Sequence, residues 1–117
     1  MGTNYYAIKN KISLYPQSIH IGKSSAGWKF LFRGYFKEDN YFLENKEISS
    51  IDDWKSFLKN EDYIILDEYN EVISYDEFFK MVEQFQSNNN IDDFRYNGNI
   101  NGYRFCFREF SWYIWKK

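Results

Sequence analysis

Apolar and polar residues alternate along three stretches of the first third of the chain, a pattern typical of half-buried β-strands. These stretches are residues 3–9, 18–23 and 28–36. In the third stretch the large aromatic residues fall on one face and the basic residues fall on the other. Residues 24–27 (SSAG) are turn formers by composition. The pattern therefore predicts a small antiparallel sheet whose second and third strands are joined by a tight turn.

Helical spacing of apolar residues replaces this alternation in the middle of the chain. A helix is predicted over residues 51–59, where Ser49 and Ser50 can cap its start. A second helix is predicted to begin after the capping box of Ser74 and Glu77 and to end near Phe85. Between the two helices, residues 63–66 and 71–73 predict a hairpin with an acidic tip.

The last third returns to alternation, with strands predicted over residues 103–107 and 110–115. The order of elements is then three strands, a helix, two strands, a helix and one or two strands. This order predicts an α+β fold with a small antiparallel sheet of about five to seven strands and two helices. A length of 117 residues fits a single domain spanning residues 1–117.

The formal net charge of −2 conceals an uneven distribution of charge along the chain. Residues 1–37 carry a net charge of +6, residues 38–93 of −12 and residues 94–117 of +4. If these segments separate in space, the protein presents an acidic surface that can steer a basic partner. If they interleave, their charges neutralise each other, and the sequence leaves both arrangements open.

Composition removes several classes of function. One cysteine and one histidine exclude an internal disulfide framework and a cluster of metal-binding Cys or His residues, so we expect no metal and no cofactor. No apolar run approaches the roughly 20 residues that cross a bilayer, and the N-terminus lacks an apolar signal-peptide core. These features lead us to expect a cytoplasmic protein that does not enter a membrane.

The segment HIGKSSAGW at residues 20–28 is the first candidate for chemistry. Its Gly-Lys-Ser resembles the end of a phosphate-binding P-loop, but Gln17 stands where the first glycine belongs, and strand-like residues follow where a helix is needed. A simple turn between strands is one interpretation. The other is a turn that binds an anionic ligand through backbone N–H groups and a set of side chains. That set is His20, Lys23, Ser24, Ser25 and Trp28.

Catalytic and nucleic-acid-binding interpretations have less support. His20 lacks an identifiable partner for general-base catalysis, and a lone strand residue such as Cys106 is typical of packing, although Arg104 and Arg108 flank it. We therefore expect no enzyme. The basic strand residues form a small footprint in a chain with a pI of about 5.4, so we expect no direct binding of nucleic acid.

The acidic middle of the chain suggests a protein partner instead. Carboxylates on helices and a hairpin can imitate the phosphates of a nucleic acid and compete for a basic groove. The hairpin residues Asp67, Glu68 and Glu71 are the candidates for this contact.

Several motifs give the chain a resemblance to a family of small phage and prophage proteins. They include MGTNYY at residues 1–6, HIGKSSAGW at 20–28, DEY at 67–69 and EFS at 109–111, in the family's order. Many family members resemble a zinc-knuckle design with two cysteines just before HIGKSS. Residues 10–18 contain no cysteine here, so the resemblance implies no metal.

The family has no established biochemical function, so the resemblance implies a phage or prophage origin and no particular mechanism. Small accessory proteins of phages often inhibit host defence, as anti-CRISPR proteins do. The leading hypothesis is therefore a non-enzymatic, anti-CRISPR-like inhibitor that acts in the bacterial host cytoplasm. Its partner would be a defence protein or ribonucleoprotein complex. The alternative is a protein that sequesters a small anionic ligand or signalling nucleotide at residues 20–28.

Overall fold

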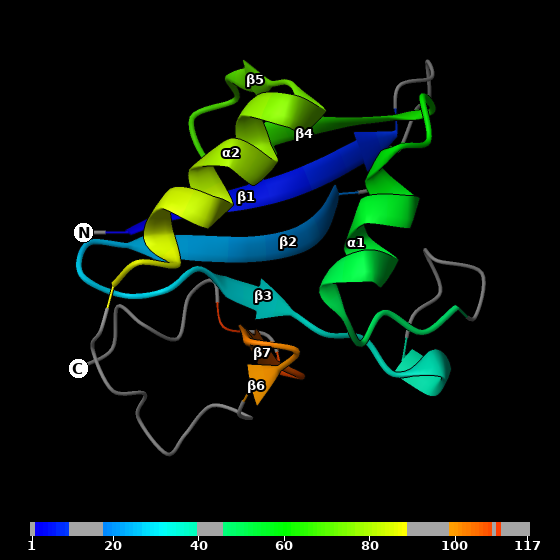
Figure 1. Cartoon of the computed structure of the whole chain (residues 1–117). Helices are drawn as coiled ribbons and strands as arrows, with labels where there is room; N and C mark the ends of the chain where they lie inside the picture. Colours follow the sequence, from blue (N-terminus) through cyan, green and yellow to red (C-terminus); the bar gives the residue numbers. More distant parts are fainter. Residues whose placement is uncertain (1, 10–17, 40–45, 89–98, 109, 111–117) are drawn as a thin grey trace.

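A computed structural model describes residues 2–9, 18–39, 46–88, 99–108 and 110 (Figure 1). The elements follow the predicted order. They are β1 (Gly2–Lys9), β2 (Ser18–Ser25), β3 (Leu31–Arg33), a short 3-10 helix η1 (Lys37–Asp39), α1 (Ile51–Leu58), β4 (Tyr63–Asp67), β5 (Val72–Ile73), α2 (Tyr75–Phe85), β6 (Asn99–Ile100) and β7 (Tyr103–Cys106). Most of the strand predicted over residues 110–115 lies outside the described residues.

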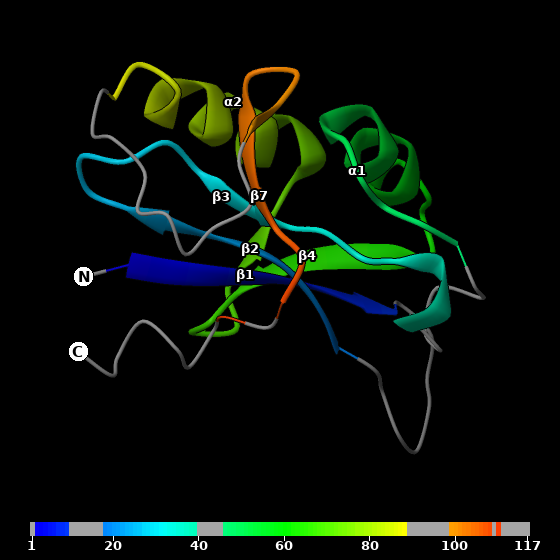
Figure 2. The same cartoon turned by 90° about the horizontal axis from the view of Figure 1, so that it is seen from below.

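The strands form one sheet of seven in the order β5-β4-β1-β2-β3-β7-β6, which confirms the predicted α+β fold. All paired strands are antiparallel except β3 and β7, which run parallel. Both helices cover the same face of this sheet (Figures 1 and 2). We call this the helix face and the opposite side the far face.

The third strand is much shorter than the predicted stretch of residues 28–36. β3 contains only Leu31–Arg33, because Trp28 belongs to the preceding turn. After β3, the N–H of Gly34 donates to the carbonyl of Cys106 in β7. Tyr35 then pairs with Ile48 in an isolated bridge. Only Leu31 and Phe32 therefore pair with β2, and the residues that follow pair with β7 and with Ile48 instead.

Both helices begin at the predicted serine caps. The hydroxyls of Ser50 and Ser74 accept hydrogen bonds from the N–H groups of Asp53 and Glu77, respectively, which satisfies one exposed donor in each first turn. Buried residues follow at helical spacing in each helix, so one face of each helix packs on the sheet. In α1 the indole N–H of Trp54 also donates to the carbonyl of Arg33 at 2.9 Å.

Polar contacts tie the end of α2 to the turn between β2 and β3. The ammonium of Lys29 donates to the carbonyl of Gln86, and the amide of Asn88 donates to the carbonyl of Trp28. A cation at this position also interacts favourably with the negative end of the helix dipole. In addition, Tyr103 of β7 donates to Glu83 of α2, and this hydrogen bond raises the pKa of Tyr103 to about 12.

Aromatic rings fill the space between the helices and the sheet. Phe78 of α2 is fully buried and lies in edge-on contact with Phe30, at a centroid distance of 5.5 Å, and with Tyr5 at 5.4 Å. Phe32 and Phe105 stack across the parallel strand pair at 5.4 Å. Within the described residues, no helix has the length and apolar character that crossing a membrane would require.

Replacing Phe78 tests this packing. Phe78→Ala should lower the free energy of unfolding by about 3–5 kcal/mol, because it removes the buried ring that joins α2 to the sheet. Tyr69→Ala, at a side chain that is 67% exposed, should change it by less than about 0.5 kcal/mol. Urea unfolding followed by circular dichroism measures both. Equal losses in the two variants would contradict the assigned core.

Candidate functional site

A β-bulge in the central strand pair decides where the side chains of β2 point. Tyr5 pairs with Gly22 and Tyr6 pairs with His20, so Ile21 is an extra residue without its own partner. Asn4 then pairs with Lys23. Because Asn4 and Tyr6 are two residues apart on β1, their partners lie on one face of the sheet.

This shift corrects the simple alternation expected for the second strand. In a regular strand His20 and Lys23, three residues apart, would face opposite sides, but here both lie on the far face. Gly22 lies on the helix face together with Ile21. A Cβ atom at Gly22 would stand 2.4 Å from the Phe30 ring, so the glycine allows this ring to pack closely against β2.

The far face holds a buried polar network around Asn4. The carboxylate of Glu68 accepts from the backbone N–H of Asn4 at 2.7 Å and from its side-chain amide at 3.2 Å. The Oδ1 atom of Asn4 lies 2.9 Å from Nε2 of His20. Because the Asn4 amide donates to Glu68, its Oδ1 is the acceptor, and the His20 proton in this bond is on Nε2.

Aromatic and apolar side chains cover this network. The ring of His20, which is 4% exposed, lies between Tyr6 at 5.2 Å and Phe110 at 4.6 Å, measured between centroids. Phe110 belongs to a buried cluster with Leu31 and Cys106. The Cys106 thiol is buried and donates to the carbonyl of Arg108. His20 and Cys106 are therefore packed inside the protein.

The structure spreads the five residues of the predicted ligand-binding turn over different environments. Ser24 and Ser25 extend β2, so the prediction that residues 24–27 form the turn is wrong at its start. The turn runs from Ser25 to Trp28, with Gly27 at a φ of 86°. Ser24 hydrogen-bonds to Tyr5 on the helix face, opposite His20 and Lys23, while Trp28 packs against the guanidinium of Arg104.

Lys23 is buried at 2% exposure in the middle of β2. Burial lowers its pKa below the ordinary value of 10.5, and the negative charge of Glu68 partly opposes this effect. Its aliphatic stem runs close to the backbone of Gly2, where a Cβ atom would stand 2.3 Å from Cε of Lys23. Lys23 therefore serves as part of the interior of the sheet.

Several basic side chains of the β3 and β7 region donate to backbone carbonyls. Arg104 donates to Lys29, Arg33 donates to Gly34, and Lys29 donates to Gln86. Arg33 also lies over the ring of Tyr35 at 4.3 Å. These contacts hold the predicted basic strand faces against the protein itself.

The three acidic residues of the predicted hairpin tip also have different roles. The carboxylate of Asp67 accepts from the N–H groups of Tyr69 and Glu71, which shapes the turn between β4 and β5. Glu68 belongs to the far-face network described above. Glu71 is exposed, and so are the neighbouring large side chains of Tyr69 and Val72, each at 67%.

Beside this hairpin, carboxylates from two elements line one cavity. Asp67 and Glu71 of the hairpin and Glu77 of α2 meet there with Val72, in a cavity of about 520 Å³. Lys80 is the lysine in its lining. We call this the hairpin groove. It combines three acids with an exposed apolar side chain at the edge of the sheet.

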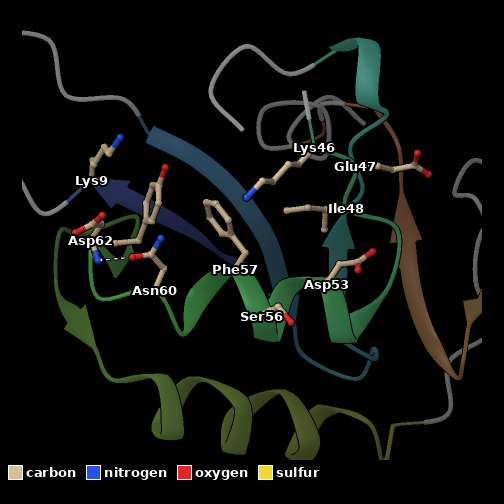
Figure 3. Close-up of a pocket in the computed structure, with 10 residues that line it drawn as sticks. Lys9, Lys46, Glu47, Ile48, Asp53, Ser56, Phe57, Asn60 and Asp62 are labelled. Carbon is tan, nitrogen blue, oxygen red and sulfur yellow. Dashed lines mark hydrogen bonds between the residues drawn. The ribbon is translucent and has the colours of Figure 1, made fainter. Parts of the chain in front are cut away.

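A second cavity, which the sequence did not predict, runs along α1 from Asp53 in its first turn to Asn60 just beyond its C-terminal end (Figure 3). We call it the helix-end pocket. Its lining comes from three separate segments of the chain, so no motif within one segment could predict it. Its volume is about 360 Å³. The lining residues are Lys9, Lys46, Glu47, Ile48, Asp53, Ser56, Phe57, Asn60, Asp62 and Tyr63.

Neither cavity holds a cluster suited to a metal ion. Within the part of the chain that the structure describes, no three His, Cys, Asp or Glu side chains are grouped in a way that could hold one. Comparison of the chain with known protein families, curated proteins and solved structures finds no match.

The buried lysine gives a testable dependence of stability on pH. Since folding lowers the pKa of Lys23, the folded chain releases this proton at a lower pH than the unfolded chain does. The contribution of Lys23 to the free energy of unfolding should therefore rise with pH up to about 10.5. Lys23→Met lacks this contribution, so the difference between wild type and variant should grow in favour of wild type as the pH rises toward about 10.5.

Urea unfolding of both proteins across this range measures the difference. Lys59→Met, at an exposed lysine, corrects for the loss of one positive charge. A difference that shrinks with rising pH would contradict the burial of Lys23.

Proposed function

We propose that this protein is a non-enzymatic binding protein that recognises a basic protein surface through the hairpin groove. The observation that carries this proposal is the meeting of Asp67, Glu71 and Glu77 around the exposed Val72, at the edge of the sheet. The buried positions of His20 and Cys106 support a function without catalysis. The proposal therefore rests on charge and exposed apolar area.

The groove fits a partner that combines cationic and apolar groups. Exposed carboxylates attract a basic surface over a distance of about 8–10 Å at physiological salt and accelerate its association. Tyr69 and Val72 offer apolar area that such a partner can bury, and aromatic residues are common anchors at protein interfaces. Asp67 contributes charge but also holds the turn, so the binding surface and the hairpin shape depend on each other.

We further propose that the partner is a bacterial anti-phage defence complex, as for anti-CRISPR proteins, and that binding inhibits it in the host cytoplasm. The resemblance to small phage proteins supports this setting. Nucleic-acid-guided complexes bind their targets in positively charged channels. An acidic protein surface that occupies such a channel would exclude the nucleic acid.

Two matched double variants test the surface. Tyr69→Ala/Glu71→Lys removes one exposed aromatic side chain and reverses one exposed acid at the hairpin. Phe36→Ala/Glu38→Lys makes the same two changes at exposed residues near η1. Tagged wild type and both variants are used to capture proteins from a bacterial lysate at low and moderate salt. Captured proteins are identified by mass spectrometry, and affinities are measured with the purified partner.

We expect wild type and the η1 control to bind a defence-complex subunit, with affinity that falls as salt rises. The hairpin variant should bind at least about tenfold more weakly, which corresponds to about 1.4 kcal/mol. Thermal unfolding of each variant checks that the fold is intact. Equal binding by the two variants, or a captured partner without a basic surface, would overturn the proposal.

A further inference from the structure

The helix-end pocket carries an inference that is independent of the hairpin groove, with which it shares no lining residue. We propose that this pocket binds a small planar anion, an aromatic ring that carries a phosphate or carboxylate group. A nucleoside monophosphate has this chemistry and serves as the probe. The pocket volume of about 360 Å³ lies in the lower part of the range of about 300–1,000 Å³ for small-molecule sites.

Two lysines supply positive charge at this pocket. Lys9 ends β1 and Lys46 precedes α1, and both side chains are exposed. In Figure 3 their ammonium groups lie on either side of the Phe57 ring. The Lys9 ammonium is also 5.9 Å from the centroid of the Tyr63 ring. An anionic group held above these rings would thus be reached from both sides by ammonium donors.

Two aromatic rings supply a surface on which a planar group can stack. Phe57 of α1 and Tyr63 of β4 are in tilted contact, with centroids 4.5 Å apart, and both remain partly exposed. Partly exposed ring faces of this kind can stack with any nucleobase, because every base has a π-face. The combination of lysines with accessible aromatic rings favours a ligand that is both planar and negatively charged.

The carboxylates in the lining do not oppose an anion equally. Asp53 accepts from the backbone N–H of Ser49 at 2.9 Å, which engages it at the start of α1. The carboxylate of Glu47 points away from Phe57 in Figure 3. Asn60 and Asp62 lie at the end of the pocket near Lys9. The side-chain oxygen of Asn60 accepts from the backbone N–H of Asp62 at 2.8 Å, and the carboxylate of Asp62 can accept from an amino group on the ligand ring. Lys9 and the oxygens of Asp62 thus share one end of the pocket, and Lys46 lies on the other side of Phe57.

The test separates the ring from the anion. AMP, CMP, GMP and UMP are titrated into the protein by isothermal calorimetry, together with adenosine and uridine as rings without charge and inorganic phosphate as an anion without a ring. The carboxylate source is tested with 4-hydroxybenzoate. We expect saturable binding of at least one ring-bearing anion, and at least tenfold weaker binding of the nucleosides and of phosphate.

Substitutions then locate the site. Lys9→Ala and Lys46→Ala change exposed side chains and should each weaken binding by about tenfold. Lys80→Ala, at the exposed lysine of the hairpin groove, is the matched control and should leave affinity unchanged. Phe57→Leu keeps an apolar side chain but removes the stacking face, so it should also weaken binding. Amide chemical shifts of Ser56 and Asn60 should move on titration.

Three results would overturn the inference. They are no saturable binding of any ring-bearing anion at millimolar concentration, equal binding of inorganic phosphate and the nucleotides, and equal losses in Lys46→Ala and Lys80→Ala. The first two results do not bear on the hairpin groove, whose own variants retain Lys9 and Lys46, and the third would move nucleotide binding away from the helix-end pocket. Failure of one site is therefore distinguishable from failure of the other.

Discussion

The register of the central strand pair is the constraint on which the rest of the structure depends. One extra residue, Ile21, shifts the pairing of β2 with β1. The alternation of side chains between the two faces of the sheet therefore changes phase at Ile21. Gly22 can admit the Phe30 ring on the helix face, while His20 and Lys23 turn to the far face. Every described position from Ile19 to Ser24 is buried as a result. A slip by one residue would exchange these faces and place charged groups beneath α2.

Burial of the His20 imidazole in β2 is compensated by its hydrogen bond with Asn4. Asn4 joins the partly buried carboxylate of Glu68 to the buried imidazole of His20, so removing its amide would leave the imidazole with fewer partners, at a cost of about 1–3 kcal/mol. Residues 20–24 of the HIGKSSAGW segment are therefore explained by the interior of the sheet, while residues 25–28 form the turn to β3. The lysine and histidine of this segment have the residue types of a phosphate site, yet in the strand both side chains are buried on the far face, where His20 is hydrogen-bonded to Asn4.

Features set by local sequence were predictable, and features set by distant contacts were not. The serine caps of α1 and α2 and the apolar spacing that follows them lie within a few residues of each other, so the helix starts were predicted correctly. The bulge at Ile21 and the parallel pairing of β3 with β7 depend on strands far apart in the chain. The helix-end pocket joins residues 9, 46–48 and 53–63, and alternation or helical spacing within one segment carries no information about such a meeting.

Basic and acidic side chains of this protein differ in their surroundings: several basic groups contact backbone carbonyls, and several acidic groups are exposed. In the described β3 and β7 region, Lys29, Arg33 and Arg104 donate to backbone carbonyls, so their positive charge is held close to the fold. Glu71, Asp76 and Glu77 are exposed near the opposite edge of the sheet, at β5 and the start of α2. A net charge near zero therefore does not imply a uniform surface. The acids at this edge are exposed, whereas Lys29 joins the residues before β3 to the end of α2 and Arg104 joins β7 to the same residues before β3.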